Sequence, residues 1–148
     1  MDKRLVLLAD DNEATCTLIT ALLQSEFEVE IASDGNEAIE KLKHKRYSAI
    51  LLDLLMPVVD GYAVLDFLRG EHPELLRRVL VVTAALGPRE THRLRDYDIC
   101  AVIAKPFEVD GLFQSVRDCA GDDDVPSMHS PFISGGMLLL LAEMLRRV

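Results

Sequence analysis

Short runs of apolar residues that each end abruptly at a polar side chain constrain the fold of this chain more than any other feature. Four such runs cover residues 5–9, 49–52, 79–82 and 100–104. Each run is apolar at every position rather than at alternate positions, which predicts strands that are buried on both faces, as in a parallel sheet. Segments with apolar residues at helical spacing separate the runs, so strands and helices should alternate along the chain.

A fifth strand is predicted at residues 27–31, where apolar and acidic residues alternate and one face should be wetter than the other. Asp34 precedes the next helical segment and Glu37 follows three residues later, a pattern typical of a capping box. Five strand–helix pairs over residues 1–120 predict an α/β fold with a doubly wound, five-stranded parallel sheet and flanking helices.

Polar side chains stand at the carboxyl ends of four of the five predicted strands. Asp10 and Asp11 follow the first strand, Asp53 the third, Thr83 ends the fourth, and Lys105 follows the fifth. In an open α/β sheet, these ends converge on the crevice where ligands bind. We therefore expect one site built from five residues that are far apart in the sequence.

The charge of this expected site calls for a cation. Two carboxylates roughly 5 Å apart repel each other by about 3 kcal/mol at an effective dielectric of 20, and Lys105 alone cannot offset three of them. Hard oxygen ligands without His or Cys favour Mg²⁺ over a transition metal. A carboxylate nucleophile at Asp53, a hydroxyl at Thr83 and an ammonium at Lys105 suit phosphoryl transfer, which needs charge stabilisation and positioning.

At these residues the sequence resembles the response-regulator receiver family of two-component signalling, in its single-domain form. The matching motifs are Asp10-Asp11, Asp53 followed by Met56-Pro57 and Gly61, Thr83-Ala84, and Lys105-Pro106-Phe107. Each motif alone is weak, and their order at successive strand ends makes the resemblance specific. It covers roughly residues 3–120 and implies the flavodoxin-like receiver fold.

The resemblance also implies how the site would work. Asp53 would accept a phosphoryl group from a phosphohistidine on a sensor histidine kinase or a histidine phosphotransfer protein. Asp11 would bind Mg²⁺ directly, Asp10 mainly through water, and the backbone carbonyl of Leu55 would be the third protein ligand. Thr83 would move toward the phosphoryl group, and the change would alter the binding of a downstream protein. Such a protein is not an enzyme in the ordinary sense, because it catalyses only its own phosphorylation and dephosphorylation.

Three positions depart from the family pattern. Receivers usually carry Tyr or Phe three residues before the lysine, and this chain has Val102. Receivers often place polar side chains that orient the attacking water where this chain has Leu55 and Ala85. Because Leu55 and Ala85 are apolar, we expect slow self-dephosphorylation. Val102 keeps open an alternative function, in which the chain is a degenerate receiver that acts as a phosphorylation-independent binding platform.

Other function classes fit less well. The loop after the first strand lacks the glycines and hydroxyls of a flavin site and the D-x-D spacing of a haloacid-dehalogenase-type phosphatase. The net charge of −9 argues against nucleic acid as a direct partner. Arg89, Arg93 and Arg95 form either a solvated helix face or a surface for an acidic partner.

The ends of the chain and its cysteines predict location and domain organisation. The N-terminus is not a signal peptide, and the widely spaced Cys16, Cys100 and Cys119 fit reduced thiols, so we expect a cytoplasmic protein. Residues 1–120 should be the receiver domain, 121–136 a linker and 137–148 a short apolar helix. That helix, about 18 Å long, cannot cross a hydrocarbon core of about 30 Å. It should pack on its own domain or form a homodimer, and association with a membrane surface is the alternative.

Overall fold

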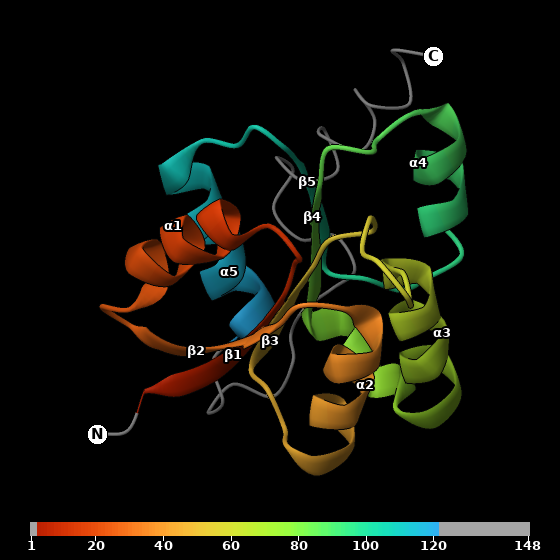
Figure 1. Ribbon diagram of the computed structural model, residues 1–148, viewed down its shortest axis with the longest axis horizontal. Helices are drawn as coiled ribbons and strands as arrows, with labels where there is room; N and C mark the ends of the chain where they lie inside the picture. Colours follow the sequence, from red (N-terminus) through yellow and green to blue (C-terminus); the bar gives the residue numbers. More distant parts are fainter. Residues whose placement is uncertain (1–2, 122–148) are drawn as a thin grey trace.

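The computed structural model describes residues 3–121, which form a five-stranded parallel sheet between two layers of helices (Figure 1). The elements in order are β1 (Arg4–Ala9), α1 (Glu13–Leu23), β2 (Phe27–Ala32), α2 (Gly35–His44), β3 (Ala49–Leu52), α3 (Gly61–Glu71), the 3-10 helix η1 (Pro73–Arg78), β4 (Val79–Thr83), α4 (Pro88–Leu94), β5 (Ala101–Ala104) and α5 (Val109–Ala120). The predicted doubly wound α/β fold is confirmed.

The strand order β2-β1-β3-β4-β5 places the point where the chain changes direction across the sheet between β1 and β3. Ligands of open α/β sheets bind at the carboxyl ends of the strands at such a point. The parallel register pairs Ala9 with Leu52, the last residues of β1 and β3, and the Asp53 N–H donates to the Ala9 carbonyl over 3.0 Å. The residues after these two strands, Asp10 and Asp53, are therefore neighbours.

The two faces of the sheet carry two separate apolar cores. Helices α1 and α5 cover one face, and α2, α3 and α4 cover the other (Figure 1). Along β1, Val6 and Leu8 point into the core under α1 and α5, while Leu7 and Ala9 point into the core under α2 and α3. Because both faces are buried, the central strands β1, β3 and β4 are apolar at every position except Arg4 and Thr83 at their ends, as the sequence predicted.

Side-chain caps fix where the helices begin. Asn12, Asp34 and Asp60 accept hydrogen bonds from backbone N–H groups at the first turns of α1, α2 and α3. The Asp34 cap was predicted correctly, but the predicted hydrogen bond from the Asp34 N–H to the Glu37 carboxylate is wrong. Glu37 accepts from the backbone N–H of Ser33, over 3.1 Å, and from the Ser33 hydroxyl, rather than from the N–H of Asp34.

The loop between β3 and α3 is held against its neighbours by close backbone contacts. The Gly35 N–H donates to the Val59 carbonyl over 2.9 Å, and a Cβ at Gly35 would lie 2.3 Å from that oxygen. At the tip, Val58 has a φ of 66° and the Val59 N–H donates to the Pro57 carbonyl over 2.7 Å, which makes a γ-turn. A β-branched residue is strained in this conformation.

Two cation–π contacts join α3 to α4 and to the residues that follow α4. The Arg93 guanidinium lies 3.6 Å from the centre of the Tyr62 ring, and the Arg69 guanidinium lies 4.6 Å from the centre of the Tyr97 ring. The Arg93 side chain is thus exposed to solvent and also contacts the ring of Tyr62. Val102 is buried in the same apolar core as Tyr97, so an aliphatic side chain occupies the position where the family usually has an aromatic ring.

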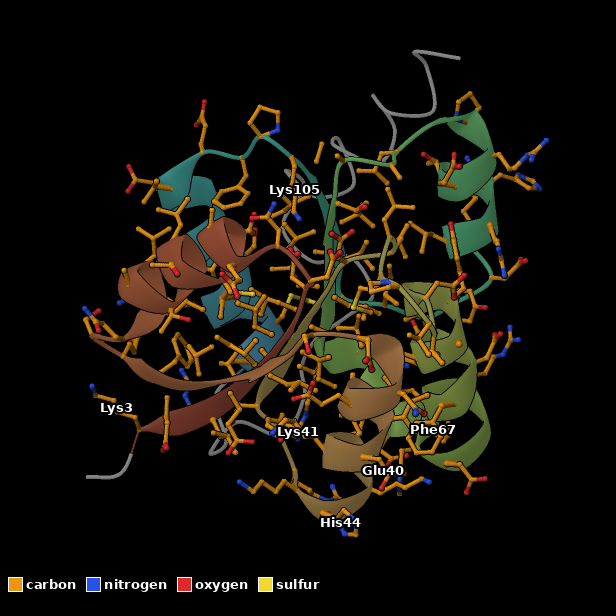
Figure 2. The ribbon with its side chains drawn as sticks, in the orientation of Figure 1. Lys3, Glu40, Lys41, His44, Phe67 and Lys105 are labelled. Atoms are coloured by element: carbon orange, nitrogen blue, oxygen red, sulfur yellow. A yellow bond between two sulfur atoms is a disulfide. The ribbon has the colours of Figure 1, made fainter. Side chains whose placement is uncertain are left out.

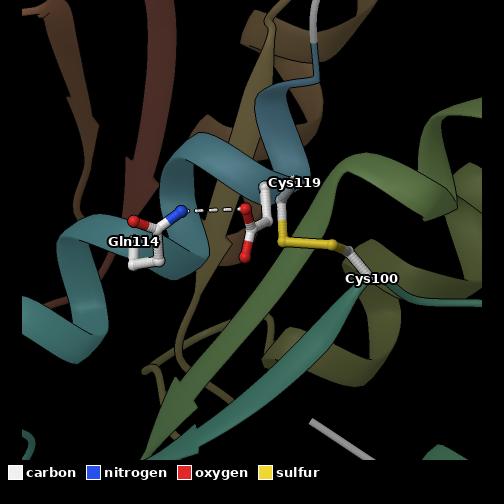
Figure 3. Close-up of a disulfide and its surroundings, with 4 residues drawn as sticks. Cys100, Gln114 and Cys119 are labelled. Atoms are coloured by element: carbon white, nitrogen blue, oxygen red, sulfur yellow. Dashed lines mark hydrogen bonds between the residues drawn. A yellow bond between two sulfur atoms is a disulfide. The ribbon is translucent and has the colours of Figure 1, made fainter. Parts of the chain in front are cut away.

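The expectation of three reduced thiols is wrong for two of them. Cys100 and Cys119 form a disulfide, with their Cα atoms 5.7 Å apart (Figure 3), and only Cys16 is free among the cysteines. The two residues are 19 positions apart in the sequence. They meet because α5 runs back along the sheet toward the beginning of β5, a return that the spacing of the cysteines does not reveal.

The predicted linker and apolar C-terminal helix lie outside the described residues. Of the helices within residues 3–121, none has the length and apolar character that a membrane crossing requires.

Candidate functional site

Three carboxylates meet at the carboxyl ends of β1 and β3. Asp10, Asp11 and Asp53 each have an oxygen within 4.8 Å of the others. Asp10 and Asp53 are buried, with 3% and 7% of their surface exposed, whereas Asp11 is exposed. The sequence placed these acids at one site, and the structure brings them together.

Asp53 accepts hydrogen bonds on both carboxylate oxygens. Its Oδ1 accepts from the Thr83 hydroxyl over 2.8 Å and from the Leu55 N–H over 3.1 Å. Its Oδ2 accepts from the Lys105 ammonium over 3.0 Å. Three donors from the ends of β3, β4 and β5 therefore fix the orientation of this one carboxylate.

Lys105 joins the two buried acids. Its ammonium lies 2.6 Å from Asp10 Oδ2 and 3.0 Å from Asp53 Oδ2. Burial lowers the pKa of Lys105, but the hydrogen bonds to Asp10 and Asp53 outweigh burial, so the pKa stays above its usual value. Lys105 is labelled in Figure 2 at the upper edge of the sheet, opposite the end where Glu40 and His44 lie. The ammonium is thus charged and directed into the acidic site.

Backbone N–H groups complete the site. The Asn12 N–H donates to Asp10 Oδ1 over 2.9 Å, and the Ala85 N–H donates to the Thr83 hydroxyl oxygen over 3.2 Å. With the Leu55 N–H, these donors orient three of the five predicted side chains. Sequence reasoning missed all three, because any residue type can supply a backbone N–H and no sequence signal marks it.

The donor set fits a small divalent cation. All three acids offer hard oxygen atoms, and the exposed Asp11 leaves one side of the cluster open to water, which suits the partly hydrated coordination of Mg²⁺. Three negative charges beside one positive charge also favour a cation on electrostatic grounds. The Leu55 carbonyl belongs to the same loop, and its role as a ligand stays a prediction.

The rim of the site is apolar on the side of the β3–α3 loop. Leu55 is 60% exposed and Val58 is 86% exposed, although both are large hydrophobic residues. Ala85, on the loop after β4, is partly buried. Positions 55 and 85 thus carry no polar side chain.

A fixed carboxylate, a charged lysine, a hydroxyl donor and a cation-binding acid cluster together can support phosphoryl transfer. The carboxylate can act as the nucleophile, and the lysine and the hydroxyl can bind the transferred group. The remaining charge on the acids is what a divalent cation would neutralise.

Comparison with known families finds one that spans most of the chain. A family model described as the response regulator receiver domain matches residues 6–117. The regulatory protein VanRB of Enterococcus faecalis is 28% identical over 113 residues, which are 76% of this chain and 50% of VanRB. The chain thus spans about half the length of this curated relative.

Two solved structures resemble the fold closely. The receiver domain of sensor histidine kinase PA1611 from Pseudomonas aeruginosa, solved with a magnesium ion coordinated in its active site cleft, is 28% identical, has a TM-score of 0.73, and aligns over 82% of this chain and 100% of that one. The receiver domain of a signal transduction histidine kinase from Syntrophus aciditrophicus is 26% identical, has a TM-score of 0.73, and aligns over 86% of this chain and 98% of that one.

Proposed function

The chain belongs to the response regulator receiver domain family of two-component signalling, and from this premise we propose that Asp53 is its phosphoacceptor. The observation that carries the proposal is the arrangement around Asp53. A buried carboxylate at the end of β3 is hydrogen-bonded by Thr83 and Lys105 and lies within 4.8 Å of Asp10 and Asp11. Each of these groups has a use in phosphoryl transfer.

In the proposed reaction, an Asp53 carboxylate oxygen attacks the phosphorus atom of a phosphohistidine. A phosphorus–oxygen bond forms, the phosphorus–nitrogen bond breaks, and the histidine nitrogen of the donor keeps the electron pair. The product is an acyl phosphate on Asp53. Lys105 lies close enough to Asp53 Oδ2 to bind the transferred group, and its positive charge offsets the charge that the group brings.

Thr83 supplies a hydroxyl donor next to the new acyl phosphate. Its hydrogen bond to Asp53 Oδ1 is available to a phosphoryl oxygen, and the Ala85 N–H holds the hydroxyl oxygen in place. Transfer of this hydrogen bond would pull the end of β4 and the loop that follows. Movement of that loop is how we propose that phosphorylation changes the binding of a downstream protein.

We propose Mg²⁺ as the cofactor, held by Asp10, Asp11, Asp53 and the backbone carbonyl of Leu55. When bound, it would neutralise negative charge on the acids and on the transferred group. The acid cluster supports this, and so does the magnesium ion in the related PA1611 receiver domain.

The partners follow from the chemistry. The donor is a phosphohistidine on a sensor histidine kinase or a histidine phosphotransfer protein, and the acceptor of the signal is a protein rather than nucleic acid. The alternative of an idle binding platform is disfavoured, because all five residues needed for the chemistry are present and in contact range. Residues 121–148 remain candidates for a linker and a dimerising helix.

A small donor with a phosphorus–nitrogen bond tests the proposed function. Phosphoramidate should add one phosphoryl group to the chain in the presence of Mg²⁺, as measured by intact mass, and an excess of EDTA should abolish the adduct. A chain that gains no adduct from phosphoramidate or acetyl phosphate at saturating Mg²⁺ would instead support the idle platform.

A further inference from the structure

The disulfide between Cys100 and Cys119 joins the last turn of α5 to the residue before β5. Cys100 directly precedes β5, and its N–H donates to the Val79 carbonyl at the beginning of β4 over 2.9 Å. Cys119 lies in the last turn of α5, one residue before the helix ends (Figure 3). The bond therefore attaches the end of α5 to the sheet.

The surroundings of the pair suit thiols as well as the disulfide. Cys100 and Cys119 are 8% and 5% exposed, and both belong to the apolar core that contains Leu80 and Val116. A buried cysteine thiol behaves as a small apolar side chain. Because the same core accepts either form, reduction does not require the fold to change.

The disulfide encloses a functional segment. The residues between the two cysteines form β5, Lys105 and nearly all of α5. Lys105 holds its place through Asp10 and Asp53, at the far end of β5 from Cys100. The end of α5 has other attachments, since Arg117 forms an ion pair with Glu26 over 2.7 Å and Arg4 donates to the Gly121 carbonyl. Reduction should therefore loosen the last turn of α5 without releasing the helix from the sheet. It should also leave the acidic site assembled, because Lys105 keeps its contacts with Asp10 and Asp53.

We propose that Cys100 and Cys119 are a reversible thiol–disulfide site, whose oxidation fixes the end of α5 to the beginning of β5. The bond closes at the last turn of a helix, where the backbone opens most readily, and the apolar core around it also accepts two thiols. The partner is a low-molecular-weight thiol and its disulfide, such as glutathione. This proposal does not depend on the phosphoryl chemistry at Asp53.

The exchange proceeds in two balanced steps. One cysteine thiolate attacks a sulfur of glutathione disulfide, which forms a mixed disulfide and releases one glutathione thiolate. The second cysteine thiolate then attacks the protein sulfur of the mixed disulfide, which forms the Cys100–Cys119 bond and releases the second glutathione. In total, two electrons and two protons pass from the protein dithiol to glutathione disulfide, which becomes two glutathione thiols.

Both cysteines are nearly buried, at 8% for Cys100 and 5% for Cys119, so exchange depends on which end of the bond can open. The last turn of a helix frays, and Cys119 is in that turn, whereas Cys100 is held by the β4 backbone. Exchange should therefore follow opening of the end of α5. Oxidation should in turn suppress that opening, because the disulfide holds the last turn of α5 next to the beginning of β5.

The first test measures the redox state of the full-length chain carrying Cys16→Ala, so that only the proposed pair reports. The protein is equilibrated in buffers of varied glutathione to glutathione disulfide ratio, and free thiols are alkylated and counted by intact mass. We expect two thiols to appear and disappear together, reversibly, within the tested range. A bond that stays closed at every ratio, or thiols that stay free at every ratio, would overturn the proposal.

The second test measures amide hydrogen exchange with the disulfide intact and after reduction. We expect exchange to be at least tenfold faster after reduction in the peptide that covers residues 112–121, with no change in the peptide that contains Asp53. The double variant Cys100→Ser and Cys119→Ser should exchange like the reduced protein in either buffer. Equal exchange in residues 112–121 of the oxidised and reduced protein would contradict the proposed role of the bond.

Discussion

The Thr83 hydroxyl donates a hydrogen bond over 2.8 Å to Asp53 Oδ1, between two buried residues that are 30 positions apart in the sequence. This contact connects the end of β4 directly to the proposed phosphoacceptor. A phosphoryl group on Asp53 would compete for the same hydroxyl, which would couple the proposed chemistry at the end of β3 to the position of the loop after β4.

Replacement of Asp11 tests the proposed magnesium site. Mg²⁺ should raise the thermal unfolding midpoint of the wild type, because a ligand that binds only the folded chain stabilises it. Asp11→Asn removes one charge from an exposed position and should weaken Mg²⁺ binding by about tenfold or more, as measured by titration calorimetry. Asp96→Asn, on another exposed acid, is the control and should bind Mg²⁺ like the wild type. Equal affinity in all three proteins would rule out Asp11 as a ligand.

Replacement of Leu55 tests the expectation of slow self-dephosphorylation. The Leu55 side chain is 60% exposed at the rim of the site and cannot hydrogen-bond to an attacking water. Leu55→Asn should orient that water and shorten the lifetime of the phosphoryl group by on the order of tenfold. Phosphate loss is followed by intact mass after the donor is removed. Leu18→Asn, at an exposed leucine on α1, should not shorten it. A wild-type lifetime of seconds would refute the expectation.

The strained turn at Val58 predicts a stabilising substitution. Val58 has a φ of 66° and is 86% exposed, so its side chain contributes little packing to offset the strain. Asparagine tolerates this conformation, and Val58→Asn should raise the free energy of unfolding by about 1 kcal/mol in urea denaturation. Val109→Asn, at a valine that is 45% exposed in an α-helix, should not be stabilising. A loss of stability in Val58→Asn would show that the turn is not strained.

The hydrogen bonds of Glu30 predict a pH-dependent contribution to stability. Lys45 donates to Glu30 over 2.5 Å and Tyr47 donates over 2.7 Å, and these bonds lower the pKa of Glu30 below its usual 4.5. Because the folded-state pKa is the lower one, the stabilisation is present above pH 4.5 and is lost as the pH falls through the folded-state pKa.

Comparison of wild type with Glu30→Gln isolates this contribution. The wild type should exceed the variant by about 1 kcal/mol in free energy of unfolding at pH 7, and the difference should vanish toward pH 3. Glu28→Gln, at an exposed position on the same strand, should show no such trend. A difference that does not change with pH would mean that the charge of Glu30 is not the cause.

The sequence predicted the parts of the fold that follow from repeating patterns. The buried runs and their polar ends were enough to place β1, β3, β4 and β5 and to bring Asp10, Asp53 and Lys105 to one edge, because parallel strands align their carboxyl ends. The gathering of the three acids at one edge needed no long-range information beyond this rule, whereas the strand order β2-β1-β3-β4-β5 was not predicted.

The parts that could not be predicted depend on contacts between distant backbone segments. The Cys100–Cys119 bond depends on how far α5 returns along β5, and neither residue marks that distance in the sequence. The Val58 γ-turn follows from the docking of the β3–α3 loop on Gly35, which a valine does not suggest. The N–H of Leu55 is likewise part of the site without any side-chain signal.

The most direct test of the central claim compares phosphorylation of wild type, Asp53→Asn and Asp60→Asn. Asp60 is a nearby exposed acid that caps α3, and asparagine caps equally well, so this control keeps the fold. Each protein is incubated with Mg²⁺ and acetyl phosphate, and its intact mass is measured. Wild type and Asp60→Asn should gain one phosphoryl group, and Asp53→Asn should gain none. An adduct on Asp53→Asn equal to that on the wild type would contradict Asp53 as the phosphoacceptor.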